Sequence, residues 1–441
     1  MLAFKLRILF FFCLTAFLID SYVWQAFKTI IKNRTQRFKK RLFYVYWGLP
    51  VIILLLFALF LFNDTFNQYK YFRTYFQGFL MVLYSAKLLV FLFLLADDLK
   101  RGLKWSQHHL FRLVFSKNKK VVKHDLTDEM EEVIAENIQP TALQMNRSEF
   151  LAKAGLISSA VPFVLLTRGM YRGAYNYQVR SLDVVLPNLP ASFDGLKVLQ
   201  ISDIHCGSFL DRAAVARGIQ LIKEQNADLV LFTGDLVNNK AEEAQEWKSL
   251  FAEITAPMGV YSILGNHDYG DYVNNWKSLE EKEANFNELL AIHKDMGWRL
   301  LRNEHVLLES EGKQIALIGV ENWGDKARFQ KIGDVKKAIQ GMPEVPVKLL
   351  MSHDPSHFEK IVSVEHQDID ITFSGHTHGF QFGVEFGPIR WSPSQYMYQQ
   401  WADLYEKGNQ KIYVNRGFGF LGYPGRVGIL PEITVMNLYR S

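Results

Sequence analysis

Five short polar blocks occur in one order along the chain, and each follows an apolar run that predicts a β-strand. Together they offer the carboxylate, amide and imidazole groups that bind divalent cations. The blocks are Asp203-Ile204-His205, Gly234-Asp235, Gly265-Asn266-His267-Asp268, Ser352-His353-Asp354 and Gly375-His376-Thr377-His378. Each block alone is common in proteins that bind no metal. The ordered set, with every block at a strand end, predicts a metal centre.

The spacing within the blocks favours two ions rather than one. Two divalent ions roughly 3.5–4 Å apart can hold a phosphate together with the attacking oxygen. Ions that close need a shared anionic ligand, and Asp235 is the natural candidate. Asp203 and His205 are two positions apart, so both can reach one ion, whereas His376 and His378, with the same spacing, can face two ions. We therefore expect hydrolysis of a phosphate ester.

The elements that position these blocks lie after about residue 176, where short β-rich runs alternate with amphipathic stretches. This alternation is typical of a layered α/β or α+β fold. Strands are predicted over residues 196–201, 228–232, 259–264, 347–351 and 370–373, and helices over 211–226 and 242–254. Ligand sites in layered sheets gather at the carboxyl ends of strands. The glycines at 234, 265 and 375 permit tight turns there.

The first hundred residues are strongly apolar and predict membrane spans at 8–27, 44–62 and 76–96. A fourth apolar segment, 150–167, contains Lys153 and Pro162, and it predicts either a further span or an amphipathic connector. With the preceding Asn146 to Glu149 it resembles a twin-arginine export signal that lacks one arginine. We therefore divide the chain into a transmembrane region at 1–115 with about three spans, a polar linker at 116–148, a membrane segment at 149–170 and a catalytic domain at 176–441.

Loop charge predicts the orientation of these segments. Basic residues crowd residues 28–41 and 100–123, whereas 63–75 carries only Lys70 and Arg73. Because cytoplasmic loops are enriched in Lys and Arg, a fourth span would place the catalytic domain outside the cytoplasm of a bacterial inner membrane. Without that span the domain is cytoplasmic. Asp20 and Lys87 lie inside predicted spans, where charges are costly unless paired, and they can pair with each other or bind a lipid headgroup.

Composition excludes some classes of function. The net charge of +5 is too small over 441 residues to indicate nucleic-acid binding, and no nucleic-acid partner is expected. The two cysteines cannot supply a disulfide framework. The sequence does not indicate which oligomeric state the protein adopts.

The five blocks together resemble the calcineurin-like metallophosphoesterase superfamily, from about residue 195 to the C-terminus. The resemblance implies a four-layer αββα sandwich with two divalent ions, which can be manganese, zinc or iron. It implies one ion bound by Asp203, His205, Asp235 and His378, and a second bound by Asp235, Asn266, His353 and His376. It further implies that His267 contacts the phosphate and protonates the leaving oxygen, and that Asp268 orients His267.

The layout also resembles a narrower bacterial branch of membrane-attached or exported phosphoesterases, which includes UDP-2,3-diacylglucosamine pyrophosphatases. Residues 413–419 are similar to the closing strand and Gly-rich loop of that branch. Arg416 in this loop can reach a phosphate, or it can be a surface arginine in a turn.

We therefore expect a membrane-anchored hydrolase for phosphodiester, pyrophosphate or phosphomonoester bonds of a phosphorylated small molecule, lipid-linked compound or envelope metabolite. One alternative is a UDP-2,3-diacylglucosamine pyrophosphatase of lipid A synthesis, and another is a non-catalytic metal-binding membrane module. The expected partners are that substrate and membrane lipids. Aromatic residues such as Tyr272, Trp276, Phe386, Trp391 and Tyr398 can contact an acyl chain or sugar, or can pack as ordinary core.

Overall fold

The computed structural model describes residues 2–63, 69–115, 147–326, 329–387 and 389–441. The chain divides into two compact units, Met1–Leu165 and Leu166–Ser441, which we call the helical unit and the catalytic unit. Of the linker predicted at 116–148, only residues 147 and 148 fall inside the described residues, and they begin a helix.

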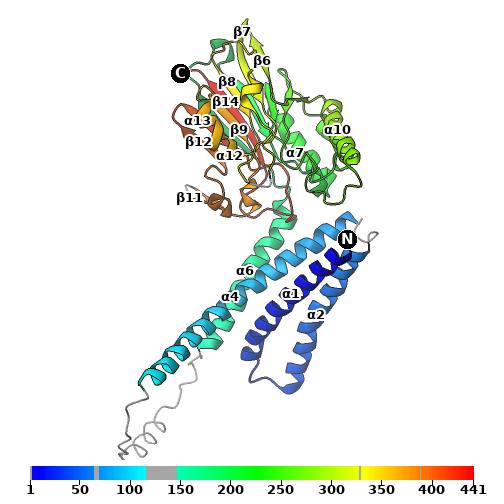
Figure 1. Cartoon of the computed structure of the whole chain (residues 1–441), viewed down its shortest axis with the longest axis vertical. Coiled ribbons are helices and arrows are strands. Elements are labelled where there is room, and N and C mark those ends of the chain that lie inside the picture. The colour runs from blue at the N-terminus through cyan, green and yellow to red at the C-terminus, as the bar shows by residue number, and fades with distance from the viewer. Residues whose placement is uncertain (1, 64–68, 116–146, 327–328, 388) are drawn as a thin grey trace, which may run out of the picture. The chain divides into compact units, whose positions relative to one another are not determined.

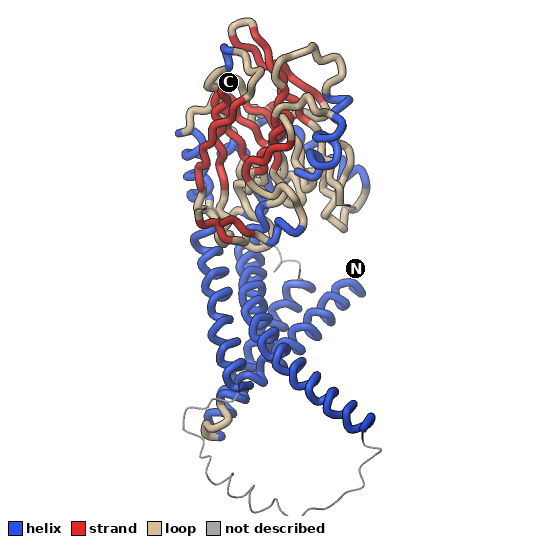
Figure 2. Tube along the Cα trace, turned by 90° about the vertical axis from the view of Figure 1, so that its left-hand side faces the viewer, coloured by secondary structure: helices blue, strands red, loops and turns tan. Residues whose placement is uncertain are grey.

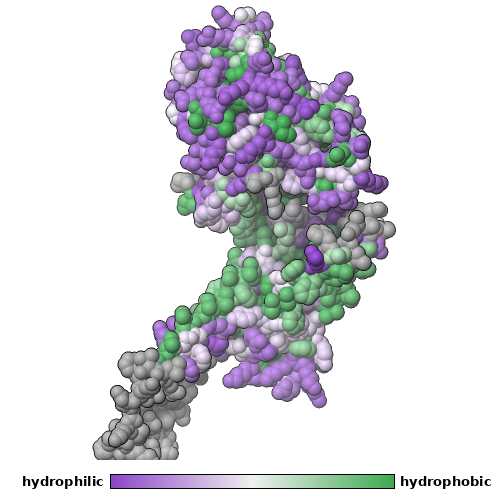
Figure 3. Space-filling view, viewed as in Figure 1, coloured by the Kyte–Doolittle hydropathy of each residue, from purple (hydrophilic) through white to green (hydrophobic). Residues whose placement is uncertain are grey.

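The helical unit is built from long apolar helices (Figures 1 and 3). They are α1 (Leu2–Ile30), α2 (Gln36–Phe62), α4 (Lys70–Phe115) and α6 (Arg147–Arg168), the last of which reaches into the catalytic unit. Each is long and apolar enough to cross a bilayer. The segment predicted at 150–167 lies within α6. These four helices indicate a multi-pass membrane protein.

The two charges predicted inside spans contact each other, as expected. Lys87 Nζ donates a hydrogen bond to the buried carboxylate of Asp20. The hydroxyl of Tyr84 donates to the same carboxylate at 3.3 Å, and that of Tyr46 donates to the Asp20 carbonyl at 2.8 Å. Because charges in a membrane persist only when paired, this arrangement satisfies both groups and links α1, α2 and α4.

The catalytic unit contains two six-stranded mixed sheets (Figures 1 and 2). The first sheet has the order β1 (Gln178–Val185), β14 (Glu432–Tyr439), β2 (Leu196–Ile201), β3 (Leu229–Phe232), β4 (Val260–Ser262) and β5 (Arg299–Leu300). The second has the order β12 (Asp403–Lys407), β13 (Gln410–Val414), β9 (Ile371–Ser374), β8 (Lys348–Met351), β7 (Lys313–Gly319) and β6 (Glu304–Ser310). A separate pair, β10 (Val384–Phe386) and β11 (Ile389–Trp391), forms a short antiparallel ribbon.

Helices and short turns cover the outer faces. The α-helices are α7 (Arg212–Glu224), α8 (Glu242–Gln245), α9 (Lys248–Phe251), α10 (Leu279–Asp295), α11 (Val335–Ala338), α12 (Pro355–His357) and α13 (Ser363–Glu365). The π-helical and 3-10 segments are η2 (Gly169–Gly173), η3 (Ala191–Phe193), η4 (Cys206–Ser208), η5 (Phe358–Val362), η6 (His378–Gln381) and η7 (Pro393–Tyr396). The prediction of a single helix over 242–254 is wrong, because this segment forms two short helices, α8 and α9.

Three hydrophobic clusters define the layers. Val198 and Leu231 of the first sheet pack with Leu349 of the second, so this cluster fills the space between the sheets. Their neighbours Leu199 and Phe232 point to the opposite face, against α7 and α10. A third cluster joins the outer face of the second sheet to α11 and η5. The order helix, sheet, sheet, helix confirms the predicted fold class.

Candidate metal centre

All five polar blocks lie just beyond the carboxyl ends of strands. Blocks one to three follow β2, β3 and β4, which run parallel in the first sheet. Blocks four and five follow β8 and β9, which run parallel in the second sheet. Since the strands of each sheet end at one edge, the blocks of that sheet converge there. The structure brings the two sets together, although 173 residues separate Asp203 from His376.

Two glycines allow this close approach. A Cβ atom at Gly265 would lie 2.2 Å from Asp235 Oδ1, and one at Gly375 would lie 2.3 Å from Asp203 Oδ2. Both distances are shorter than any real contact, so a side chain at either position would displace a carboxylate of the site. The glycines predicted to form turns therefore also make room for the acidic residues.

Five of the polar side chains stand on left-handed backbone. Asp203, His205, Asp235, His376 and His378 have φ between 50° and 70°. A non-glycine residue in this region is uncommon and carries strain, which concentrates at functional sites because the surrounding fold must impose it. The fold thus holds these five residues in an unfavourable conformation that turns their side chains toward one another.

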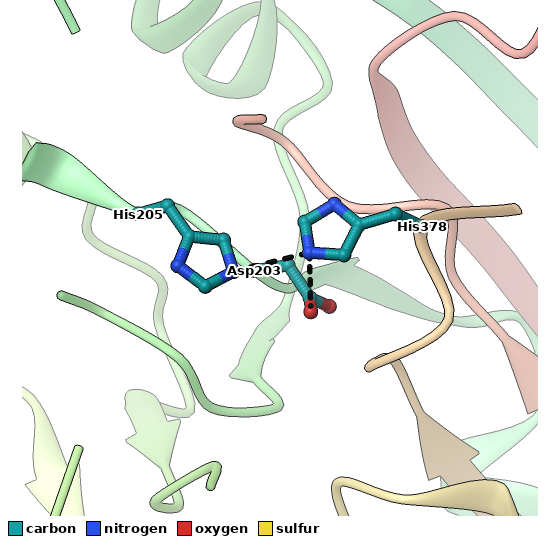
Figure 4. Close-up of side chains that lie close together, drawn as sticks. All are labelled: Asp203, His205 and His378. Carbon is teal, nitrogen blue, oxygen red and sulfur yellow. Dashed lines mark hydrogen bonds and ion pairs between the residues drawn. The ribbon is translucent and has the colours of Figure 1, made fainter. Parts of the chain in front are cut away.

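The first cluster consists of Asp203, His205 and His378, all buried (Figure 4). His378 Nε2 lies 3.0 Å from His205 Nε2 and 3.2 Å from Asp203 Oδ1. His205 Nδ1 donates to the carbonyl oxygen of Val237 at 3.2 Å. A neutral imidazole that donates through Nδ1 keeps a lone pair on Nε2, so His205 presents a ligand atom to the cluster.

The second cluster consists of Asp235, His353 and His376. His353 Nδ1 donates to the carbonyl of Thr233 at 2.7 Å, which leaves its Nε2 facing Asp235 Oδ2 at 3.2 Å. Asn266 Oδ1 lies 3.2 Å from the same Nε2, while its amide Nδ2 donates to the Tyr272 hydroxyl at 2.7 Å. The amide is thereby oriented with its oxygen toward the cluster, as the expected neutral ligand requires.

Asp235 connects the two clusters through one oxygen. Its Oδ2 lies 3.2 Å from Nε2 of His353 in the second cluster and 3.6 Å from Nε2 of His205 in the first. Its Oδ1 accepts from the backbone N–H of His267 at 2.8 Å. This is the position that a bridging carboxylate requires.

The electrostatics of the site reflect its burial. Burial lowers the pKa of His205 to about 3, although nearby Asp235 opposes the shift. Burial also acts to lower the pKa of His353, but Asp235 outweighs it and raises that pKa to about 10. Burial opposes ionisation of Asp235, yet His353 and His267 hold its pKa well below the usual value. Asp235 is therefore an anion that draws cations to the junction of the clusters.

His267 stands beside the first cluster and is less buried than most of the set. Its ring lies 5.0 Å from that of His205 and is stacked on Tyr272 at 4.3 Å. Its Nδ1 donates to the Asn238 carbonyl at 2.6 Å, so Nε2 is the ring nitrogen that can contact a substrate. A partner other than Asp268 therefore orients the ring.

The expected role of Asp268 is wrong. Its carboxylate accepts from the backbone N–H groups of Asp235 and Gly265 at 2.9 Å through Oδ2, and of Leu236 at 2.9 Å through Oδ1. Burial and the charge of Asp235 raise its pKa to about 7. Asp268 therefore ties together the loops after β3 and β4, because unpaired backbone donors in this buried turn would be costly. It positions Asp235 rather than the His267 ring.

Arg416 does not face the metal centre either. It is wholly buried, and its guanidinium bonds to Glu432 at 2.6 Å, to Asp403 at 2.7 Å and to Glu385. These acids also pair with Arg180 and Arg390. We call the six residues the arginine cluster (Arg180, Arg390, Arg416, Glu385, Asp403 and Glu432). With three carboxylates around it, Arg416 is held away from any phosphate.

Sequence reasoning missed two residues that contact His376. Its Nε2 lies 2.8 Å from the Tyr398 hydroxyl and 3.5 Å from Asp354 Oδ2. Because Nε2 is hydrogen-bonded to the Tyr398 hydroxyl, Nδ1 is the nitrogen that can face the second cluster. Asp354 lies within the fourth block, directly after His353, which was an available signal. Nothing local marked Tyr398, which lies 22 residues from its partner.

The residues present fit a pair of divalent cations. Two buried carboxylates, an amide oxygen and several oriented imidazole lone pairs converge, and this mixed oxygen and nitrogen set suits manganese, iron or zinc. The imidazoles are fixed from behind by carbonyl oxygens, as is usual for histidines that bind metals.

Comparison with known families agrees with this geometry. Residues 196–380 match the model of the calcineurin-like phosphoesterase family. Residues 6–174 match a model described as "Probable Calcineurin-like phosphoesterase, transmembrane domain". The chain belongs to the calcineurin-like metallophosphoesterases and carries the transmembrane domain found with them. It is a membrane-anchored metallophosphoesterase.

Several relatives share this assignment at low identity. The metallophosphoesterase YkuE of Bacillus subtilis is 27% identical over 306 residues, which cover 67% of this chain and 98% of that protein. A "Transmembrane protein with metallophosphoesterase domain" of Danio rerio is 27% identical over 65% of this chain, but the match spans only 63% of the relative's length. The UDP-2,3-diacylglucosamine pyrophosphatase LpxG of Chlamydia muridarum is 27% identical over 46% of this chain and 69% of its own.

Proposed function

We propose that the chain is a phosphoester or pyrophosphate hydrolase with a dinuclear metal centre, acting on a lipid-linked or envelope metabolite. The observation that carries the dinuclear centre is the position of Asp235 Oδ2 between a histidine of each cluster. The first ion would be held by Asp203, His205, Asp235 and His378. The second would be held by Asp235, Asn266, His353 and His376. Manganese, zinc and iron all suit this set.

Two divalent ions at this site would neutralise phosphate charge and make a water acidic enough to act as nucleophile near neutral pH. The protein's own part is to position and to transfer a proton. Asp268 holds the backbone around Asp235 in place, and Tyr272 fixes both the Asn266 amide and the His267 ring. His267 Nε2, the nitrogen not bonded to Asn238, is placed to donate a proton to a leaving oxygen.

The lipid-linked substrate is supported by the helical unit. An enzyme held in a bilayer encounters a substrate in the same membrane more often than one in solution. The similarity to LpxG supports a narrower alternative, hydrolysis of the pyrophosphate in UDP-2,3-diacylglucosamine. That substrate is a cytoplasmic nucleotide sugar, so a catalytic unit outside the cytoplasm would count against it. The remaining alternative is a metal-binding membrane module without turnover.

The decisive experiment is hydrolysis of a bis-aryl phosphate by the full chain with Mn²⁺, Zn²⁺ or Mg²⁺ in turn. We expect turnover that chelation abolishes. Asp235→Asn and His267→Ala should each lower kcat at least about a hundredfold, the scale for loss of one acid/base or electrostatic group. Asp295→Asn, which alters an exposed carboxylate paired with Lys248, and His305→Ala serve as matched controls. Bound metal without turnover of any phosphoester would instead favour the non-catalytic module.

A screen of the products formed from nucleotides, phospholipids and lipid A precursors then separates the substrate classes: inorganic phosphate indicates phosphomonoester hydrolysis, whereas new phosphomonoesters indicate hydrolysis of a phosphodiester or pyrophosphate. Selective formation of UMP and 2,3-diacylglucosamine 1-phosphate from UDP-2,3-diacylglucosamine would establish the narrower alternative.

We further propose that the catalytic unit lies outside the cytoplasm of a bacterial inner membrane. Loop charge supports this orientation, provided that α6 crosses the bilayer. Alkaline phosphatase fused after residue 180 should then be active. An inactive fusion would place the catalytic unit in the cytoplasm.

A further inference from the structure

The ribbon of β10 and β11 has two chemically different faces. Val384 pairs with Trp391 and Phe386 with Ile389, whereas Glu385 pairs with Arg390 between them. Because side chains alternate along a strand, the four apolar residues share one face and the two charged residues share the other.

The polarity of the ribbon is the reverse of what water favours. On the apolar face, Phe386 is 78% exposed and Ile389 is 61% exposed. The charged face is turned inward: Glu385 accepts from Arg416, and Arg390 pairs with Asp403. A strand pair packed on a soluble domain normally buries its apolar face and solvates its charges. This ribbon is therefore built for apolar surroundings.

The exposed apolar surface continues on both sides of the ribbon. We call the whole set the outward apolar face, and all of its members are exposed. They are Phe380, Phe382, Val384, Phe386, Ile389, Trp391, Tyr396 and Met397. Several of them contact one another: the Phe382 and Trp391 rings lie 6.4 Å apart, and the Trp391 indole donates to the Tyr396 hydroxyl at 3.3 Å. Grouped apolar side chains of this kind are a mark of an interaction surface, unlike single exposed residues elsewhere.

The ribbon is joined by hydrogen bonds to the end of α6 within the catalytic unit. Gly383, which precedes β10, donates to the carbonyl of Val427 at 2.9 Å, and Val427 donates to that of Gln381 at 2.8 Å. The adjoining Arg426 donates from its backbone to Gly169 at 3.2 Å. The Tyr423 hydroxyl bonds to the carbonyl of Leu166. Three segments, 166–169, 423–427 and 381–383, thus lie side by side.

The first of these segments is the end of a candidate membrane span, residues 147–173. That end carries Tyr171, which is exposed, with Arg168 and Arg172 on either side of it. Aromatic and basic residues in this position are typical of the boundary between bilayer and water. A bilayer crossed by α6 therefore ends beside the segment from which the ribbon extends.

The ribbon belongs to a segment, residues 379–397, that is attached to the metal centre at both ends. It begins after His378 of the first cluster and ends before Tyr398, whose hydroxyl contacts His376 of the second. Ser392 Oγ, just after β11, donates to the Gly379 carbonyl at 2.7 Å and closes the segment at its base. The ribbon is therefore attached at both ends to residues of the metal centre.

We propose that the outward apolar face inserts into the interfacial region of a phospholipid bilayer and presents the metal centre to phosphate groups at headgroup level. The membrane is favoured as occupant because the face adjoins the exit of a membrane helix and combines aromatic with aliphatic side chains. The bilayer contact stands by itself. Only the delivery of a lipid-borne phosphate rests on the proposed function.

The contact can be measured on the full chain in vesicles of phosphatidylethanolamine and phosphatidylglycerol that contain nitroxide-labelled lipids. A fluorophore is attached at Phe386→Cys or Ile389→Cys in a Cys13→Ala background. The Cys13→Ala parent, treated with the same fluorophore, reports any reaction of buried Cys206. The matched control is Leu279→Cys, an apolar residue that is 82% exposed at the start of α10. We expect strong quenching at 386 and 389 and little at 279.

Equal quenching at all three positions would overturn the proposal. So would protection of 386 that depends on protein concentration in lipid-free detergent without nitroxide quenching, because that result assigns the face to a second copy of the chain.

Activity separates this proposal from the proposed function. The double variant Phe386→Asp and Ile389→Asp should hydrolyse soluble bis-aryl phosphate normally, but an acyl-linked aryl phosphodiester embedded in the vesicles at least about tenfold more slowly. The control pair is Leu279→Asp and Val364→Asp, the latter at a residue of α13 that is 61% exposed, and it should change neither rate. An equal loss on both substrates would contradict the presentation of the site at the membrane. If no variant and no parent hydrolyses either compound, the proposed function fails while the quenching result still decides the contact.

Discussion

The catalytic unit contains two groups of charges with buried members, and their charges are balanced in different ways. In the arginine cluster, Arg180, Arg390 and Arg416 face Glu385, Asp403 and Glu432, so three positive groups meet three negative ones. In the metal centre, the carboxylates of Asp203 and Asp235 form ion pairs only with imidazoles, within the residues that the structure describes. The charges of the arginine cluster are balanced within the protein, whereas those of the metal centre are balanced when it binds cations.

This difference indicates that the arginine cluster stabilises the fold, whereas the metal centre binds ligands. A buried ion pair adds little net stability, but the removal of one partner leaves an uncompensated charge and is strongly destabilising. The arginine cluster joins β1, β14 and the loop after β13 to the inner face of the ribbon. The metal centre instead joins the strand ends, and its carboxylate and imidazole groups are of the kinds that bind divalent cations.

The largest expected effect comes from breaking the balanced group. Arg416→Met should lower the free energy of unfolding by about 3–5 kcal/mol, because it leaves Glu432 buried without its closest cation. Denaturant unfolding of the full chain in detergent measures this, with the exposed Arg440→Met as control. The folded fraction should keep its metal content. An unchanged stability with a raised KM would contradict the structure and restore Arg416 as a phosphate contact.

The two groups also differ in how well sequence predicted them. The metal centre was predictable because each strand delivers its ligands within four residues of its carboxyl end, so local pattern and fold class were sufficient. The arginine cluster was not, because Arg180 and Glu385 are 205 residues apart and nothing near Arg416 marks its partners. The role of Asp268 was mistaken because it rested on the family resemblance alone. The carboxylate instead satisfies backbone donors, one of them in the loop after β3.

The layers were predicted from alternating apolar runs, and the boundaries of β2 matched the expected residues. The ribbon was not predicted as a strand pair, since its three-residue strands are too short to show a period. The outward direction of its apolar face depends on ion pairs that Glu385, on the opposite face, forms with Arg180 and Arg416, which are distant in the sequence.

His293 adds a third kind of buried ionisable group to the comparison, one whose ring has no hydrogen-bond partner among the described residues. Within the described residues, neither of its ring nitrogens has a hydrogen-bond partner, and burial lowers its pKa to about 3. The unfolded chain keeps the ordinary value of 6.5, so it takes up the proton first as the pH falls. The contribution of His293 to stability is therefore full above pH 6.5 and is lost progressively between pH 6.5 and 3.

His293→Phe should remove this acid sensitivity. At pH 5 the unfolded wild-type chain gains about 2 kcal/mol from protonating His293, and the variant gains nothing there. The stability lost between pH 7.5 and 5 should be smaller in the variant by about that amount, as measured by denaturant unfolding at both pH values. Parallel losses in the two proteins would show that His293 is protonated in the folded state.

The smallest effect tests whether the metal centre relies on the groups that hydrogen-bond to its ligands. Tyr398→Phe removes the hydroxyl 2.8 Å from His376 Nε2 but leaves Asp354 at 3.5 Å. Because such supporting groups fix the ring orientation, we expect an affinity loss of about tenfold, confined to one of two ions. Competition with a chelator measures this, and Tyr396→Phe, an exposed neighbour without contact to His376, is the control. Unchanged affinities with a higher KM would mean that the hydroxyl serves the substrate. Equal weakening of both ions would mean that the two clusters share one support, which the separate carbonyl anchors of His205 and His353 argue against.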